Sequence, residues 1–384
     1  MQLVLIGVGQ AGGKLTDALL QRDAAGESSF VRDAVAINTA RDDLRGLERV
    51  PEDNRYLVGQ SRVSGHGVGG DNELAADIAR EERAELVNAV DVATSEVDAV
   101  LVVAGLGGGT GSGIAPVLLE ELQQLYTEPV YALGILPSDG EGGLYELNAA
   151  RSLRTVRREA DNTLLVDNGV WRASADSLDD AYATINEEVA TRLGVLFGAG
   201  EHDADAQVAE SVLDASEIIN TLDGGGVSAI GHTASPIERD DDVGGRLGGL
   251  LGSQSSVDDT TAVNQITSAI RSATYSQLSL PCDLTTVGRA LVLVSGPPEW
   301  LSRKGIERGR QWVEETTQCR EVRGGDNPVP GADHVAATVL FANVRESERL
   351  DALTETATEA QRRQQDERTD DPDLMDDDRL DSLF

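Results

Sequence analysis

The feature that most constrains this chain is a run rich in glycine, GLGGGTGSG, at residues 105–113. It follows an apolar segment, 99–104, and precedes a segment whose leucines recur at helical spacing up to Leu122. At such a strand-to-helix turn, unpaired N–H groups and the positive helix end converge, and glycines let a phosphate approach closely. Thr110 and Ser112 add hydroxyl donors. The run therefore predicts a phosphate-binding loop, since the alternative, a flexible linker, rarely lies between a buried strand and an amphipathic helix.

The same order of strand, glycine loop and helix recurs in the first half of the chain. Strands are predicted at 2–8, 34–38, 99–104, 130–136 and 163–166. Glycine-rich loops begin at Gly9, Gly65 and Gly105, and a helical pattern follows each of them, including a helix of charged residues at about 72–90. This alternation predicts an α/β fold on a parallel, doubly wound sheet.

The second half of the chain has a different pattern. A long helix at 177–198, apolar on one face, is expected to form a spine between two domains. The elements predicted after it are helices near 206–213 and 214–222 and strands at 227–232, 289–295 and 334–343. They indicate a smaller α+β domain. A helix at 347–363 then leads into a tail whose charge is too dense to support a core, and which we expect to be disordered. The predicted divisions are 1–176, 177–198, 199–345 and 346–384.

The charge of the chain is strongly acidic. Its 384 residues include 32 lysines and arginines against 67 acidic residues, a formal net charge of −35, and lysine occurs only at Lys14 and Lys304. Such a chain repels nucleic acid and anionic membranes, so neither is an expected partner. Its self-repulsion is screened in concentrated salt, where the Debye length falls to roughly 3 Å at 1 M. A salt-adapted cytoplasm is therefore expected.

No targeting segment, membrane span or metal cluster is predicted. The apolar start lacks a basic leader, and no stretch approaches the ~20 apolar residues of a membrane span. Cys282 and Cys319 are the only cysteines, and no Cys/His cluster has the spacing of a zinc site. Neither a disulfide framework nor a structural metal is indicated, which favours an intracellular protein.

Two common nucleotide motifs fit the first glycine loop poorly. GVGQAGG matches GxGxxG, but dinucleotide-binding folds usually place an acid at the end of the second strand, where this chain has Asn38. A nicotinamide cofactor is therefore disfavoured. No GxxxxGK[ST] sequence occurs, since Lys14 is followed by Leu15, so a P-loop is excluded.

The glycine loops instead resemble those of a known family. GGGTGSG at 107–113 is similar to the signature loop of the tubulin/FtsZ superfamily, and the chain up to Asn343 follows that family's order of elements. Within that superfamily, the chain resembles CetZ, the tubulin-like group of haloarchaea. The features that carry this resemblance are the acidic composition, the GQAGGK opening and the INT, GGGVS and IG segments. The resemblance implies a Rossmann-like GTPase domain, a long central helix and a smaller α+β domain.

The resemblance also implies a site for GTP or GDP with Mg²⁺. The residues it places around the nucleotide are Gly9, Gln10, Ala11, Gly12, Asn38, Gly69, Gly70, Asp71, Gly107, Gly108, Gly109, Thr110, Gly111, Ser112 and Gly113. Gln10 and Asp71 would lie near Mg²⁺ and the terminal phosphate, with the metal held through water.

Ribose and base contacts are implied in the same way. Glu141 matches the family's ribose-binding acid, although a solvated turn residue is the ordinary alternative. Asn168 matches a base-binding asparagine. Tyr182 and Asn186, at i and i+4, share one helix face, so the tyrosine can stack on a purine while the asparagine binds its edge. The alternative is a core tyrosine with an exposed asparagine.

The hydrolytic residues of the family come from the next subunit, and here they match AESVLDASEII. Asp214 and Glu217 occupy the two acidic places, whereas Val212 stands where asparagine is usual and Ala209 replaces glycine. Carboxylates at i and i+3 can orient a water for attack on the γ-phosphate. An Asp at an N-cap with Glu three residues later is also a capping box, which needs no catalysis.

Three functions follow from these observations. The first is a GTPase that polymerises head to tail, hydrolyses GTP at the contact and acts in cell shape. The second is a nucleotide-gated scaffold with little or no hydrolysis. The third, a nicotinamide oxidoreductase, leaves the second glycine loop unexplained. Hydrophobic residues occur at intervals among the acidic residues of the tail. They could dock on a partner protein, or the tail could only keep the protein soluble.

Overall fold

A single mixed sheet forms the centre of the protein. The computed structural model describes residues 1–26, 29–91, 97–138, 140–171, 178–201, 213–237 and 259–370. Within these residues the sheet has ten strands in the order β3-β2-β1-β4-β5-β6-β7-β10-β8-β9. In chain order they are β1 Leu3–Val8, β2 Val31–Asn38, β3 Arg55–Leu57, β4 Ala99–Gly105, β5 Val130–Leu136, β6 Asn162–Asp167, β7 Val227–Pro236, β8 Arg289–Gly296, β9 Val322–Pro328 and β10 His334–Val344.

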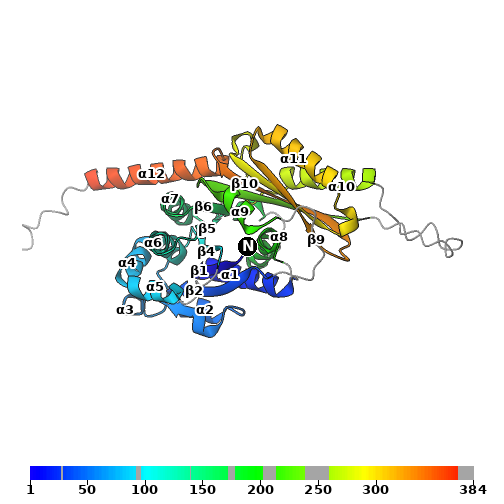
Figure 1. Ribbon diagram of the computed structural model, residues 1–384. Coiled ribbons are helices and arrows are strands. Elements are labelled where there is room, and N and C mark those ends of the chain that lie inside the picture. Colours follow the sequence, from blue (N-terminus) through cyan, green and yellow to red (C-terminus); the bar gives the residue numbers. More distant parts are fainter. Residues whose placement is uncertain are drawn as a thin grey trace, which may run out of the picture.

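Strands β1 to β6 are all parallel, and helices cover both faces of this half. The strand sequences are continuously apolar because both faces are buried. On β1, Val4 and Ile6 belong to one hydrophobic cluster and Leu3 and Leu5 to another. The helices of this half are α1 Gly9–Ala25, α2 Arg41–Arg45, α3 Gln60–Val63, α4 Asn72–Glu81, α5 Arg83–Asp91, α6 Gly109–Leu125 and α7 Gly143–Glu159. Figure 1 shows α4, α6 and α7 on one side of the sheet and α1 on the other.

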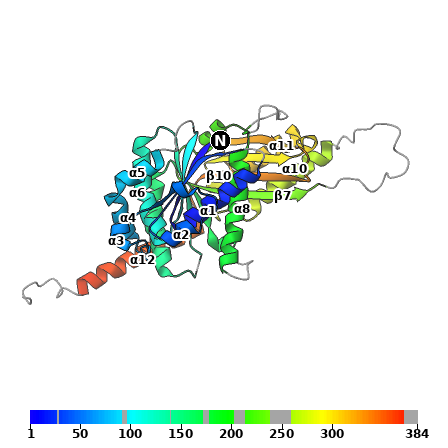
Figure 2. The ribbon, with the colours of Figure 1, turned by 90° about the horizontal axis from the view of Figure 1, so that it is seen from below.

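Helix α8, Leu178–Gly198, is the predicted spine. Its 21 residues span about 32 Å at 1.5 Å per residue. It runs beside α1 (Figure 2), and near its end a Cβ added to Gly194 would lie 2.6 Å from Cγ of Arg22 on α1. Its end meets the start of β1, where the amino group of Met1 donates to the carbonyl of Phe197 at 2.8 Å. Helix α8 therefore reaches the edge of the sheet at which the parallel strands begin.

The sheet continues into the second half of the chain. Strand β7 joins β6 in parallel through only two pairs, Thr163 with Val227 and Leu164 with Ser228, and β10 is antiparallel to β7 and β8. The remaining helices are α9 Ala215–Leu222, α10 Asp259–Tyr275, α11 Arg303–Thr317 and α12 Glu348–Asp370. The start of α12 packs on α7, and in both views the rest extends away from the body. The predicted α/β fold with an α+β second half is confirmed.

Several boundaries differ from the sequence prediction. The charged helix at 72–90 is two helices, which meet at Glu82, the C-cap of α4. The C-terminal helix was predicted to end at 363 but continues to Asp370, since a run of Glu, Gln and Arg favours helix despite its charge. The helix predicted at 206–213 lies mostly outside the described residues, and the tail from 371 to 384 lies wholly outside them.

Candidate functional site

Two helices begin side by side where β1 and β4 end. Helix α1 has Val8 as its N-cap and α6 has Gly108, and neither cap residue makes a side-chain hydrogen bond to the helix. The first N–H groups of an uncapped helix have no partner within the helix, and the helix dipole adds positive potential there. We call the edge where the parallel strands end the carboxyl edge. It presents two such helix starts together.

Glycine is required where these two turns touch. Gly9 has φ +74°, and a Cβ on it would lie 2.9 Å from the nitrogen of Gly111. A Cβ on Gly12 would lie 2.2 Å from the carbonyl oxygen of Val103 on β4. Both distances are too short for a side chain, so these glycines allow α1, α6 and β4 to pack at the edge.

Other glycines at the edge face open space. A Cβ added to Gly108, Gly69 or Gly143 would meet no heavy atom within 4 Å. The backbone of three separate loops is therefore exposed without side chains at one edge of the sheet. A polyanion could approach these loops closely, and phosphate binding by them stays a prediction.

Polar side chains hold the loops together. The hydroxyls of Thr39 and Thr110 are 2.7 Å apart, which joins the turn after β2 to α6. Asn38 accepts from the N–H of Ala40 at 3.0 Å and donates to Asp43. The buried hydroxyl of Ser112 donates to the carbonyl of Gly109, and to that of Gly108 by a very short contact. Ser112 thus stabilises its own turn.

Sequence reasoning missed one residue of the edge, Asn148 on α7. Its amide donates to the carbonyls of Gly70 at 2.9 Å and of Gly107 at 3.1 Å, and only 2% of the residue is exposed. It therefore joins the second and third glycine loops. No local pattern in the sequence marks it, because the two carbonyls that it binds lie 78 and 41 positions away in the chain.

The two residues assigned to the metal are both exposed at the carboxyl edge. Asp71 caps α4 and accepts from the N–H of Leu74 at 2.9 Å, and Gln10 lies in the first turn of α1. In the described part of the chain, no group of three or more His, Cys, Asp or Glu could hold a metal ion. A Mg²⁺ here would take most of its ligands from phosphate and water, as Mg²⁺ commonly does.

The predicted ribose and base residues follow two adjacent strands. Leu136 of β5 pairs with Asp167 of β6, so the loops after these strands lie together. Glu141 accepts from the N–H and hydroxyl of Ser138, at 2.8 and 2.9 Å, which closes its own loop. Asn168 is 8% exposed. Tyr182 and Asn186 are half-buried on α8, and Tyr182 packs against the apolar cluster on that face of the sheet.

The acidic pair lies at the start of α9. Asp214 is its N-cap and accepts from the N–H of Glu217 at 3.0 Å and the hydroxyl of Ser216 at 2.6 Å. These hydrogen bonds hold the pKa of Asp214 below its usual value. Burial, followed by the charge of Asp214, raises the pKa of Glu217. The structure is compatible with both interpretations of the pair, a catalytic pair and a capping box, because a residue that caps a helix can also take part in catalysis. Ala209 and Val212 lie outside the described residues.

The acidic pair and the glycine loops lie at opposite edges of the sheet. The amide of Asn162, the first residue of β6, donates to the carbonyl of Leu222, the last residue of α9, and to that of Gly225 just after it. At the start of α9, the positive charge of the N-terminal amino group, which lies beside the start of β1, adds to the hydrogen bonds that lower the pKa of Asp214. Asn168 follows the other end of β6. The six residues of β6 separate the two edges by about 20 Å. Within one subunit, Asp214 and Glu217 therefore cannot reach a ligand held by the loops.

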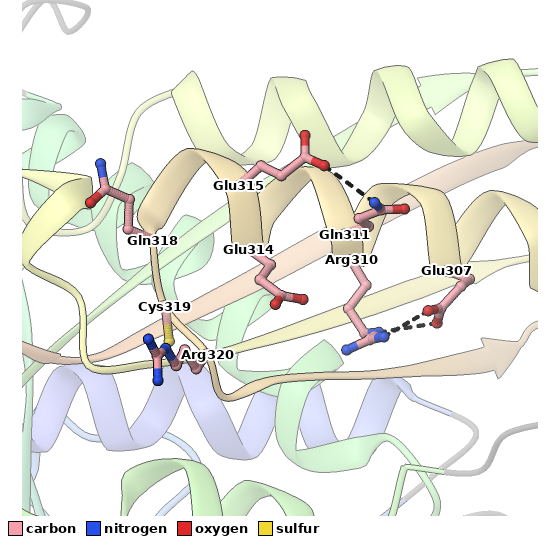
Figure 3. Close-up of a pocket in the computed structure, with 8 residues that line it drawn as sticks. All are labelled: Glu307, Arg310, Gln311, Glu314, Glu315, Gln318, Cys319 and Arg320. Carbon is pink, nitrogen blue, oxygen red and sulfur yellow. Dashed lines mark hydrogen bonds and ion pairs between the residues drawn. The ribbon is translucent and has the colours of Figure 1, made fainter.

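A cavity of about 490 Å³ lies elsewhere, beside α11 and the turn into β9. The residues that line it are Glu307, Arg310, Gln311, Glu314, Glu315, Gln318, Cys319 and Arg320. As Figure 3 shows, Arg310 is paired with Glu307 and Gln311 with Glu315. Four of the lining side chains are thus paired with one another, and no lining residue comes from the glycine loops.

Comparison with known proteins identifies the family. Residues 2–176 match the tubulin/FtsZ family GTPase domain, and residues 175–359 match the tubulin-like CetZ C-terminal domain. Tubulin-like protein CetZ1 of Haloferax volcanii is 52% identical over 366 residues, which cover 94% of this chain and 93% of CetZ1. The chain belongs to the CetZ proteins of the tubulin/FtsZ family.

Solved CetZ structures have the same fold. The GDP-bound monomer of CetZ1 from Haloferax volcanii superposes with a TM-score of 0.84 at 49% identity and covers 94% of this chain and 100% of that one. A GTPγS-bound protofilament of CetZ2 from the same organism gives 0.83 at 43% identity, with 95% and 100% covered. None of the described helices of this CetZ protein is long and apolar enough to cross a bilayer.

Proposed function

We propose that this protein binds GTP and GDP at the carboxyl edge, polymerises head to tail, and hydrolyses GTP at the contact between subunits. One observation carries the proposal. The glycine loops, which could bind phosphates, lie at one edge of the sheet. The two carboxylates that could orient an attacking water lie at the opposite edge of the same subunit. Stacking two copies head to tail brings the acidic pair of one subunit to the loops of the next. A repeated heterologous contact of this kind produces a filament.

The nucleotide is proposed to lie across the glycine loops with its phosphates at the starts of α1 and α6. The uncapped N–H groups at these starts bind the phosphates, and Thr110 adds a hydroxyl. Mg²⁺ neutralises phosphate charge, and Asp71 and Gln10 hold its water ligands. Glu141 is the proposed ribose acceptor. Asn168, Tyr182 and Asn186 are proposed to bind the base. Relatives with GDP and GTPγS bound support a guanine nucleotide.

Hydrolysis is proposed to need Asp214 and Glu217 of the neighbouring subunit. Asp214, with its lowered pKa, stays ionised and orients the water. Glu217 has a raised pKa and is the better proton acceptor. Both act by positioning and by charge at the terminal phosphate, which is most of what phosphoryl transfer requires.

The test mixes two inactive variants. Asp214→Ser with Glu217→Gln keeps a capping hydroxyl at α9 but removes both carboxylates. Gly108→Glu places a carboxylate where the phosphates would lie. We expect each to be inactive alone. An equal mixture should regain up to about a quarter of wild-type turnover, because only that share of random contacts joins an intact loop to an intact acidic pair. A mixture without turnover, or full turnover by the first variant alone, would refute hydrolysis in trans.

A second candidate is a nucleotide-gated scaffold with little or no hydrolysis. It is favoured by the capping role of Asp214, whose hydrogen bonds account for the residue without catalysis. Phosphate release measured over a range of protein concentrations separates the two candidates. A shared site gives turnover per subunit that rises steeply with protein concentration, whereas a scaffold assembles with GTP and releases little or no phosphate at any concentration.

The cellular part of the proposal is a cytoplasmic filament that controls cell shape, and it rests on the family alone. The acidic tail is proposed either to dock on a protein partner or to act only as a solubilising segment. Deletion of residues 371–384 tests this choice, since only a docking tail changes where filaments lie in the cell.

A further inference from the structure

One arginine from the far end of the chain contacts both loops that would hold the nucleoside. Arg349 is in the first turn of α12, and its side chain is 12% exposed. One of its terminal nitrogens donates to the carbonyl of Pro137 at 2.5 Å, and its Nε lies 3.6 Å from a carboxylate oxygen of Asp167. These two residues lie 212 and 182 positions earlier in the chain, at the ends of adjacent strands.

Each contact of Arg349 is next to a residue assigned to the nucleoside. Pro137 precedes Ser138, whose N–H and hydroxyl hold Glu141. Pro137 also packs beside the signature loop, since a Cβ added to Gly107 would lie 3.2 Å from its ring. Asp167 precedes Asn168, and one of its carboxylate oxygens accepts from the N–H of Gly169 at 3.0 Å.

The start of α12 is itself fixed. The hydroxyl of Ser347 donates to the carbonyl of Pro281 at 2.7 Å, and Leu353 is buried in the core shared with α7. The guanidinium is therefore held by the second half of the chain. Arg349 holds the carbonyl of Pro137 by a hydrogen bond and attracts the carboxylate of Asp167 by its charge at 3.6 Å. A lysine, with a single point charge at the end of its chain, would not keep both contacts in the same geometry.

We propose that Arg349 is a positioning residue for the nucleoside, which sets the loops of Glu141 and Asn168 at the spacing that selects guanosine. This inference rests on the proposed nucleotide site. Arg349 contacts the ribose and base side, whereas the signature loop beside Pro137 is also held separately, by Asn148 at Gly107 and by Thr39 at Thr110. Affinity for the phosphates alone should therefore not depend on Arg349.

The test compares Arg349→Lys and Arg349→Met with the matched control Arg362→Met, an exposed arginine on the same helix. Dissociation constants are measured for GTP, ATP and inorganic tripolyphosphate in concentrated KCl. We expect Arg349→Met to bind GTP roughly tenfold to a hundredfold more weakly, as displaced positioning groups commonly cause. Its preference for GTP over ATP should fall, and its tripolyphosphate affinity should match the parent.

The lysine variant keeps a positive charge beside Asp167, so it folds even if the methionine variant does not. It should show a smaller loss of GTP affinity and a correspondingly smaller loss of preference. GTP affinity and preference within twofold of the parent in the lysine variant would overturn the role of Arg349. Equal losses for GTP, ATP and tripolyphosphate would also overturn it, since they indicate a general structural defect. Failure of the parent protein to bind GTP would instead reject the proposed site.

Discussion

Replacing Gly108 with alanine should separate phosphate binding from folding. Gly108 has φ −72° and ψ 170°, which alanine adopts without strain, and its added Cβ meets no atom within 4 Å. A Gly→Ala change at such a position stabilises a protein by about 0.4–1 kcal/mol, because the unfolded chain loses freedom. The methyl group, however, enters the space where the phosphates are proposed to lie.

The expected loss in binding follows from one phosphate contact. A hydrogen bond to a charged group is worth about 1.5–3 kcal/mol. Losing one at Gly108 should weaken GTP binding roughly tenfold to a hundredfold. Calorimetric titration of nucleotide-free protein in molar KCl measures this change, and thermal melting without nucleotide measures the gain in stability.

A second alanine in the same run is the matched control. At Gly113 the added Cβ would lie 2.4 Å from the carbonyl oxygen of Asn72 and 2.6 Å from Cβ of Ala75. Overpacking of this kind costs typically about 1–3 kcal/mol, so Gly113→Ala should melt at a lower temperature. If Gly108→Ala binds GTP like the parent, the space beside Gly108 is not a phosphate site. If Gly108→Ala is destabilised, that space is not open in the folded protein.

Three further predictions concern stability. Gly12→Ala should destabilise the protein by at least about 1–3 kcal/mol in urea unfolding, because its Cβ would lie 2.2 Å from the carbonyl oxygen of Val103. Burial, followed by the charge of Arg192, lowers the pKa of His232 from 6.5 to about 4. The unfolded state therefore binds more protons between these values, so stability should fall as pH drops from about 6.5 to about 4, and His232→Gln should remove that part of the slope. The melting temperature should rise with KCl concentration, because salt screens a net charge of −35; a flat or falling curve would contradict salt adaptation.

The sequence predicted those parts of the fold that depend on local pattern. Buried parallel strands such as β1 and β5 are continuous apolar runs, and glycine turns mark their ends. Strand β9, VRGGDNP, has none of these signals, because its hydrogen bonds come from its neighbour β8. Strand β3 has only three residues. No helix was assigned to α7, α10 or α11. Polar residues interrupt the buried face of α7 and glycines that of α11. The apolar residues of α10, in contrast, recur at helical spacing at Val263, Ile266 and Ile270, so this helix could have been predicted.

The residues of the candidate site also divide into those that a local sequence pattern predicts and those that it does not. The glycines and Thr110 could be found because the residues around a phosphate loop are consecutive in sequence. Asn148 and Arg349 could not, because each joins loops that only folding brings together. The hydrogen bonds of Ser112 to the carbonyls of Gly108 and Gly109 could not be predicted either, because they depend on the geometry of the first turn of α6.

The short junction between β6 and β7 has a mechanical consequence. Only Thr163 and Leu164 pair across it, whereas β7 and β10 share nine pairs. If neighbouring subunits pull on opposite edges of the sheet, the tension within each subunit passes along α8 and across this narrow seam. Slippage under load would begin there, so stretching a filament should first shift the two halves of each subunit against one another and strain the hydrophobic clusters that continue across this junction.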